Sequence, residues 1–364
     1  MSVDAKRDLI FLPVGSPSYD FYGGDRKGQD LFANSLVTLQ ASTGKLVWYF
    51  QMVHHDIWDY DPPAQPALIT VHKHGKSIPA VAEVTKMGFV FIFDRVTGKP
   101  LFPVEERPVP LSDVPGEAAW PTQPFPAKPP ALVRQQIAEA DITDVTPESH
   151  HYCADLFHSL ENHGMYTPYG LKQTLVVPGT LGGATWSGGS FDPELGYLFI
   201  NVNELGSVGA LEPQPAGAPV SYRRGSADGE YARFWDRNQW PCEKPPWGTL
   251  NAVDVNKGEI IWKTPLGVVA GLNNHTGSPN LGGSVVTAGG LVFIGATADS
   301  RFWAFDSRSG KQLWVAELAA SAHAAPVTYT GKKSRKQFVV IAAGGGGYFQ
   351  GKTSDEVVAF TLPD

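Results

Sequence analysis

The sequence repeats one spacing four times, and this repeat restricts the chain to a small set of folds. Each copy places an aspartate (glutamine in the first copy) four residues before a glycine and a tryptophan or phenylalanine four residues after it. The copies are Leu36–Trp48, Val90–Phe102, Leu250–Trp262 and Phe302–Trp314. Self-similarity of this kind is the mark of repeat architectures, and it is unexpected for unrelated turns.

The chemistry of each copy indicates a β-hairpin. The aspartate ends one strand and can bond the amides of the turn, and the glycine supplies the positive φ angle that the turn needs. The aromatic side chain of the return strand can pack between neighbouring sheets. A further strand precedes some copies, as in Leu9–Leu12 and Gly289–Gly295. A strand and a hairpin repeated around a ring describe the blades of a β-propeller.

We therefore predict an all-β fold, a single β-propeller domain over residues 1–364 with four-stranded antiparallel blades. About five units are encoded, and the last lacks the return strand with the Gly-x-x-x-Trp spacing. The units are Ser2–Met52, Gln65–Val104, Gln173–Thr264, Gly282–Glu317 and His323–Leu362.

Composition agrees with this fold and argues against other classes of protein. The chain has 39 glycines and 30 prolines, which suits short strands joined by tight turns. Its net charge of −7 argues against a surface for nucleic acid or for anionic membranes. There is no run of 18 apolar residues that could span a membrane, and Met1–Asp4 lacks the apolar region of a signal peptide.

Two insertions interrupt the repeat, at residues 103–165 and 206–247, and we expect both to cover one face of the propeller. The first begins with the proline-rich stretch 103–130, which we expect to be an extended loop. A short helix should follow, with Thr146 as its N-cap, and end near Asn162.

Four side chains of that expected helix can ligate metals, namely His150, His151, Asp155 and His158. They fall near one helical face, but their spacing fits no usual pattern of zinc ligands. A zinc site is therefore the less favoured interpretation of this cluster.

The stretch from His54 to Pro66 carries the densest chemistry, reading His-His-Asp-Ile-Trp-Asp-Tyr-Asp-Pro-Pro-Ala-Gln-Pro. Two histidines and three aspartates lie within eight residues, between two expected strands at 45–52 and 67–71. Loops on a rigid scaffold commonly carry function, whereas a solvated acidic turn is the alternative. His54 and His55 could ligate a transition metal, or shape a pocket floor and bond the aspartates.

With the repeat and this stretch both considered, the chain resembles the quinoprotein dehydrogenases, and among them the glucose dehydrogenases. These are eight-bladed propellers that hold pyrroloquinoline quinone (PQQ). The resemblance rests also on Gly283–Trp314 and Ala342–Gly345 and covers essentially the whole chain. It corresponds to about the C-terminal five of the family's eight blades.

The resemblance implies roles for two residues. In the family a carboxylate beside the quinone takes the proton of the substrate hydroxyl while hydride passes to the cofactor, and Asp59 matches this base. A lysine that bonds the quinone oxygens matches Lys86. A carboxylate beside Ca²⁺ is held ionised and can act as a base, and a fixed ammonium stabilises a developing oxyanion. The alternative for Lys86 is a strand-edge lysine that points to solvent.

Further binding positions follow from the resemblance, with departures from the family pattern. Asp59 also matches a metal-ligating aspartate, and Ser16 stands where an asparagine ligand is usual, although a hydroxyl binds Ca²⁺ or Mg²⁺ more weakly. Thr185 replaces the asparagine of an Asn-Trp pair that meets the cofactor, and Trp186 keeps the tryptophan or packs between blades. His55 is also expected to contact the cofactor. The family's glutamate ligand and quinone-stacking groups have no counterpart after Met1.

The two cysteines, Cys153 and Cys242, sit in the two insertions. Glucose dehydrogenases have cysteines in similar places, so the resemblance implies a bridge that pins the two loops together. A bridge would require an oxidising compartment, in agreement with the periplasmic location that the family suggests. Two buried free thiols are the alternative.

The resemblance implies a PQQ-dependent oxidation of an aldose or alcohol with PQQ and Ca²⁺ or Mg²⁺ as cofactors, and with a quinone or cytochrome as electron acceptor. One alternative is a scaffold or binding propeller that no longer turns over. Another is a metal-dependent hydrolase or lactonase, although no Ser or Cys nucleophile elbow is visible. Five blades cannot close an eight-bladed ring, so we expect missing N-terminal blades, a smaller ring or a homo-oligomer.

Overall fold

The structure is a computed structural model that describes residues 1–273, 275–347 and 351–363. Antiparallel sheets dominate these residues, and five of the sheets fall within the five repeat units. The first sheet contains β1 (Ser2–Asp4), β2 (Leu9–Val14), β3 (Ser35–Gln40) and β4 (Leu46–Gln51). The second contains β5 (Ala67–Lys73), β6 (Lys76–Val84) and β7 (Val90–Asp94).

The remaining three sheets follow in the second half of the chain. The third contains β11 (Gly189–Asp192), β12 (Tyr197–Asn203), β15 (Gly248–Asp254) and β16 (Glu259–Pro265). The fourth contains β17 (Ser284–Val286), β18 (Leu291–Ile294), β19 (Arg301–Asp306) and β20 (Gln312–Glu317). The fifth contains β21 (Val327–Thr330), β22 (Gln337–Gly345) and β23 (Thr353–Phe360).

The repeated glycine and aromatic residue pack against one another from sheet to sheet. Gly98 and Gly310 have φ angles of 71° and 69°, as the hairpin prediction requires. A Cβ atom on Gly98 would lie 2.5 Å from the ring of Trp48 in the preceding copy, and one on Gly310 would lie 2.6 Å from Trp262. The indole N–H of Trp48 also donates to a carbonyl beside the next turn, at 3.1 Å. The repeat therefore specifies both the turn and the joint between successive sheets.

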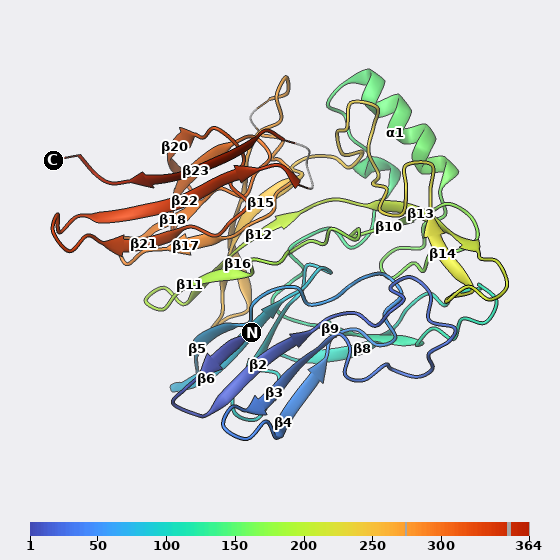
Figure 1. Cartoon of the computed structure of the whole chain (residues 1–364), viewed down its shortest axis with the longest axis horizontal. Helices are drawn as coiled ribbons and strands as arrows, with labels where there is room; N and C mark the ends of the chain where they lie inside the picture. Colours follow the sequence, from blue (N-terminus) through green and yellow to red (C-terminus); the bar gives the residue numbers. More distant parts are fainter. Residues whose placement is uncertain (274, 348–350, 364) are drawn as a thin grey trace.

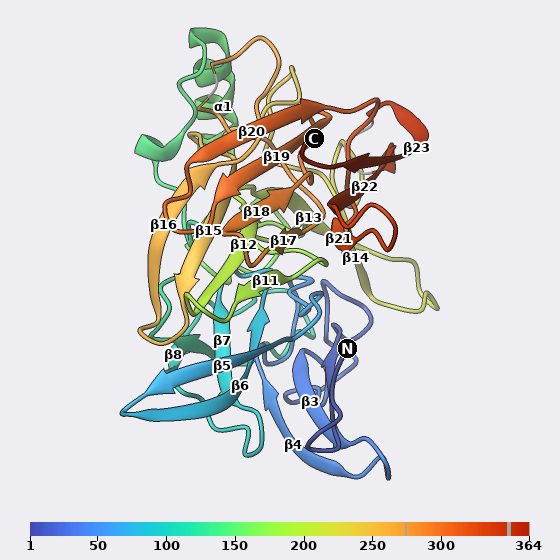
Figure 2. The same cartoon turned by 90° about the vertical axis from the view of Figure 1, so that its left-hand side faces the viewer.

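The sheets follow one another in chain order along an arc, from blue to red in Figure 2. The first strands of successive sheets are neighbours, because β1 contacts β5, β5 contacts β11, and β11 contacts β17. The core lies between the faces of adjacent sheets. Phe11 and Phe93 share the cluster between the first two sheets, and Phe302 and Ile341 share the one between the last two. These features make the fold a β-propeller.

The second sheet has three strands where four were expected, and the fifth sheet also has three. In the second unit the return strand is reduced to one bridge between Phe93 and Pro100, because proline has no N–H with which to continue a ladder. Among its described residues, the fifth unit has no return strand beyond β23, as its sequence predicts. The proline-rich stretch 103–130 is also more ordered than the expected loop, since it contains the paired strands β8 (Val104–Pro108) and β9 (Thr122–Pro126).

The second insertion contains a small sheet of its own. It holds β13 (Ser207–Pro213) and β14 (Tyr222–Gly225), and it recruits β10 (Thr174–Val176). The expected third unit, 173–264, was therefore too long at its start. Helix α1 spans Pro147–Ser159 and lies beside β10 and β13 in Figure 1. The hydroxyl of Thr146 caps the helix as predicted, by accepting a hydrogen bond from the Ser149 amide.

A disulfide joins Cys153 of α1 to Cys242 of the second insertion, which confirms the predicted bridge. The strand directions place the ends of β2, β4 and β6 and the start of β11 at one end of the sheets. The loops that carry the predicted site residues all leave the sheets at this end.

Candidate active site

The buried carboxylate of Asp56 organises the loop between β4 and β5. It accepts hydrogen bonds from the amides of Trp58 and Tyr60, at 2.9 and 2.8 Å, and from the Asn34 side chain at 2.8 Å. The Ser16 hydroxyl also donates to it. Side-chain bonds from an aspartate to nearby amides are a turn-forming device. Asp59 follows in this turn with a positive φ of 61°.

Lys86 lies between two carboxylates of this loop. Its ammonium nitrogen is 3.0 Å from Oδ1 of Asp59 and 2.6 Å from Oδ1 of Asp61, and it donates to the Asp59 carbonyl at 2.9 Å. The lysine side chain is 5% exposed, whereas those of Asp59 and Asp61 are 18% and 21% exposed. A buried ammonium therefore holds two carboxylates that solvent can still reach, and the alternative of a solvent-facing lysine is wrong.

Burial and charge act on these groups in opposite directions. Burial raises the pKa of Asp59 to about 7, against the opposing charge of Lys86 and with the Asp61 carboxylate adding to the rise. Burial by itself would lower the pKa of Lys86, but the carboxylates of Asp59 and Asp61 outweigh it and raise that pKa. The lysine is thus a permanent cation, while Asp59 can gain and lose a proton near neutrality.

The segment that carries Thr185 and Trp186 runs beside the Lys86 turn. The amide of Gly183 donates to the Lys86 carbonyl at 2.6 Å, and the amide of Ala184 donates to the carbonyl of the preceding Thr85 at 3.3 Å. Thr185 is buried, whereas the indole of Trp186 is 50% exposed. A half-exposed indole has an aromatic face that a ligand can reach. The structure therefore brings together the segments of Asp59, Lys86 and Trp186.

Two other predicted residues have different surroundings. Ser16 contacts the Asp56 carboxylate, so its pairing with Asp59 as a metal ligand stays a prediction. His55 is fully buried, with Nε2 at 2.8 Å from Glu117 and Nδ1 at 2.9 Å from a backbone carbonyl. Burial by itself would lower the pKa of His55, but Glu117 raises it. His55 thus supports the loop from within, and its contact with a cofactor stays a prediction.

Two residues near the site were not predicted as site residues. Asp20 lies in the β2–β3 loop, and burial, followed by the charge of Asp56, raises its pKa. Tyr231 belongs to the second insertion, and burial, followed by the charge of Asp59, raises its pKa. Only aromatic neighbours distinguish Asp20 in the sequence, in the run Tyr19-Asp20-Phe21-Tyr22. That signal is weak because the β2–β3 loop meets the site only in the folded chain.

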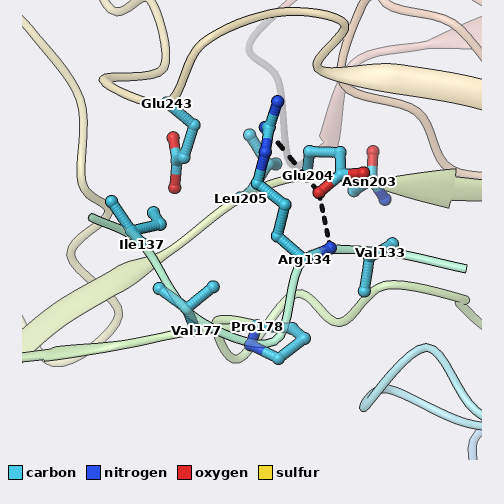
Figure 3. Close-up of a pocket in the computed structure, with 9 residues that line it drawn as sticks. All are labelled: Val133, Arg134, Ile137, Val177, Pro178, Asn203, Glu204, Leu205 and Glu243. Carbon is cyan, nitrogen blue, oxygen red and sulfur yellow. Dashed lines mark hydrogen bonds and ion pairs between the residues drawn. The ribbon is translucent and has the colours of Figure 1, made fainter. Parts of the chain in front are cut away.

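A separate narrow cavity contains a buried carboxyl group that forms no ion pair with the described residues. Glu243 points into it, opposite Arg134 and Glu204, which are joined to each other (Figure 3). One oxygen of Glu243 accepts a hydrogen bond from the Gly206 amide, and the other has no partner among the described residues. Burial raises the pKa of Glu243 to about 8. The side chains fill this space too closely to admit a ligand.

The histidines of α1 pair with different partners. His150 bonds the Thr143 carbonyl, His151 lies near Asp155, and His158 lies near Glu139. In the described ranges, no group of three or more His, Cys, Asp or Glu side chains is placed to hold a metal ion. None of the helices in the described part of the chain is both long and apolar enough to cross a membrane.

Solved structures share this fold. The europium-containing methanol dehydrogenase matches with a TM-score of 0.64 and 22% identity, over 96% of this chain and 51% of that one. The quinohemoprotein alcohol dehydrogenase from Comamonas testosteroni matches with a TM-score of 0.64 and 23% identity, over 98% of this chain and 47% of that one. At these identities the likeness concerns the fold alone.

Sequence relatives are more similar. The chain is 38% identical to quinoprotein glucose dehydrogenase A of Acinetobacter calcoaceticus, over 100% of its own length and 48% of the relative. It is 37% identical to the quinate/shikimate dehydrogenase (quinone) of Acinetobacter baylyi, over 95% of its own length and 46% of the relative. The chain therefore spans about half the length of the relatives it matches.

The family model for "PQQ: Glucose/ethanol/alcohol dehydrogenase, beta-propeller domain" matches residues 1–339. This match includes the repeat, the Asp59 loop, Lys86 and both insertions. The chain therefore belongs to the family of PQQ-dependent glucose, ethanol and alcohol dehydrogenase β-propellers.

Proposed function

We propose that this chain carries the general base and the charge-stabilising lysine of a PQQ-dependent dehydrogenase that oxidises a CH–OH group of an aldose or alcohol. The observation that carries the proposal is the position of the Lys86 ammonium, 3.0 Å from Asp59 and 2.6 Å from Asp61. A carboxylate with a pKa of about 7 beside a fixed cation suits proton abstraction at neutral pH.

The residues present fit the cofactor that the family implies. Lys86 supplies a buried cation for quinone oxygens, and Trp186, on a segment hydrogen-bonded to the Lys86 turn, supplies a half-exposed aromatic face. When bound, PQQ supplies a two-electron acceptor for the hydride of the substrate. Thr185 and Trp186 on one segment and Lys86 on the other would hold it.

The charge of the site favours a divalent cation in the same place. Asp56, Asp59 and Asp61 lie on one loop, and Lys86 is the ammonium that pairs with the latter two. Carboxylate oxygens are the ligands that Ca²⁺ and Mg²⁺ prefer. Asp59 and Ser16 are the ligands that we propose from this chain.

The chain's own groups perform two tasks in this proposal. A carboxylate oxygen of Asp59 accepts the proton of the substrate hydroxyl as the carbon-bound hydrogen departs. The Lys86 ammonium remains charged and opposes the negative charge that develops beside it. Because Lys86 is almost fully buried, water weakens this interaction little.

The substrate, the electron acceptor and the cellular location are proposals as well. The names of the relatives favour a sugar or a hydroxylated ring as substrate and a quinone as acceptor, with a cytochrome as the alternative. The disulfide supports an oxidising compartment, for which we propose the periplasm.

We also propose that one propeller domain spans residues 1–364 and that both insertions cover the end of the sheets that carries the site. N-terminal blades or a second copy of the chain would complete the ring.

The test is dye-linked oxidation of glucose, quinate and simple alcohols after addition of PQQ with Ca²⁺ or Mg²⁺. Asp59→Asn should lose about 10²- to 10⁴-fold in kcat, because it removes the base. Asp61→Asn is the matched comparison, since it removes the other carboxylate that contacts Lys86 and should lose much less.

Equal losses in the two variants would show that Asp59 only balances charge. A wild-type chain that neither takes up PQQ nor turns over would contradict the proposal for this chain. Metal-dependent hydrolysis of a lactone by the same protein would favour the hydrolase alternative instead.

A further inference from the structure

A cavity of about 460 Å³ lies between the second insertion and the loops of the third and fourth sheets. It shares no residue with the site around Lys86. Its lining includes two indoles, two guanidiniums, a carboxylate and two side-chain amides, from Trp235, Trp240, Arg233, Arg301, Asp299, Asn238 and Gln239.

One wall of the cavity is a rigid hairpin. Residues Trp235 and Pro241 pair across it, and the Asp236 carboxylate accepts hydrogen bonds from the amides of Asn238 and Trp240, at 2.8 and 2.9 Å. The hydroxyl of Ser149 in α1 also donates to Asp236, and the disulfide at Cys242 follows directly. This wall is therefore anchored to the first insertion at two points.

The opposite wall is tied together by Asp299. Its carboxylate accepts hydrogen bonds from the Val268 amide at 2.9 Å, the Arg301 amide at 3.2 Å and the Thr297 hydroxyl at 2.5 Å. These bonds join the loop after β16 to the turn after β18. They also occupy both oxygens of the carboxylate, so Asp299 acts here mainly as a structural link.

The lining is rich in hydrogen-bond donors and in flat aromatic surface. The Arg233 guanidinium lies 4.5 Å from the ring centre of Trp235, and the Arg301 guanidinium lies 5.7 Å from that of Trp303. The indole N–H of Trp235 is buried and has no acceptor among the described residues. The whole chain carries a net charge of −7, so two guanidiniums in one cavity form a local concentration of positive charge.

We propose that this cavity binds a small polyhydroxylated carboxylate of the sugar-acid class. A guanidinium pairs with a carboxylate through parallel N–H bonds. Indole faces accommodate the carbon-bound hydrogens of such a ligand. The inference does not rest on the proposed dehydrogenase function, since no residue of that site takes part.

The test is calorimetric titration of the chain, without added PQQ, with D-gluconate, D-glucose and acetate. Gluconate should bind with one site per chain, and at least about tenfold more tightly than either comparison ligand, because each lacks one half of the recognised chemistry. Arg301→Gln and Trp235→Phe should each weaken gluconate binding by about tenfold or more. The phenylalanine removes the pyrrole ring with its N–H and leaves a smaller aromatic face for the ligand.

Two control variants locate the site. Arg237→Gln removes a guanidinium from the same hairpin outside the cavity, where it stacks on Tyr152 at 5.2 Å, and should leave the affinity unchanged. Lys86→Met should also leave it unchanged, which separates this cavity from the candidate active site. The inference is overturned by absence of gluconate binding, by equal affinity for glucose or acetate, or by a loss in Lys86→Met in place of Arg301→Gln.

Discussion

Asp59 and Glu243 are two of the carboxyl groups whose pKa is raised by burial, and their surroundings give them different uses. Asp59, with a pKa of about 7, contacts the Lys86 ammonium and keeps part of its surface open to solvent. Glu243, with a pKa of about 8, lies in a narrow cavity with one oxygen unbonded in the described structure. Burial raises both values, but only Asp59 combines a cation with access for a substrate. A raised pKa alone therefore does not identify a catalytic group.

The largest effect on activity should come from removing the cation beside Asp59, which leaves this carboxyl group without an ion pair, as Glu243 is. Lys86→Met removes the cation and leaves two carboxylates in a partly buried place. We expect a loss of about 10²- to 10³-fold in kcat, the size expected for one electrostatic stabiliser, together with a lower melting temperature. Activity with PQQ and Ca²⁺, measured beside thermal unfolding, checks both.

Lys263→Met is the matched control for this change, because that lysine pairs with Glu204 and is 34% exposed. It should leave kcat nearly unchanged. An equal loss of activity in both variants would indicate general destabilisation and would remove the distinction between the two regions.

The second largest effect should come from opening the disulfide near Glu243, and it concerns stability. The double variant Cys153→Ser, Cys242→Ser opens a disulfide that spans 89 residues. We expect a loss of about 2–4 kcal/mol in the free energy of unfolding, because the unfolded chain regains conformational freedom. Denaturant titration measures it. Turnover at 25 °C should change little, since the disulfide does not touch Asp59 or Lys86, and a large loss of turnover would show that the two regions are coupled.

The smallest effect should come from Glu243→Gln, which keeps the acceptor for the Gly206 amide and removes the titration. Because the pKa of Glu243 is higher in the folded than in the unfolded chain, the folded state holds an extra proton between about pH 4.3 and pH 8. Stability from this group is therefore complete at low pH and falls as pH rises through that window, by at most about 1.4 kcal/mol per pH unit.

The variant should be closest to the wild type in stability at about pH 4, and its stability relative to the wild type should grow as pH rises to about 8. Unfolding curves at several pH values test this, with the exposed Glu139→Gln as control. Parallel pH profiles for wild type and Glu243→Gln would mean that Glu243 is ionised in the folded protein.

Much of the site could be predicted because it depends on residues close in sequence. The run His54–Pro66 contains both the proposed base and the aspartate that shapes its turn, and the family resemblance selected Asp59 among its three aspartates. Lys86 also required the family resemblance, since an isolated lysine before a strand has no local signal. The cavity of Trp235 and Arg301 could not be found at all, because its walls come from separate loops that meet only after folding.

The sequence by itself determined the hairpins, their glycine turns and the order of the sheets. These features depend on the φ angle of a glycine and on a fixed spacing between that glycine and an aromatic residue. The tertiary structure alone decided which charged groups are buried together. Burial in a shared low-dielectric region sets the pKa of Asp59, the pairing of Lys86 and the isolation of Glu243, and it depends on loops from several sheets.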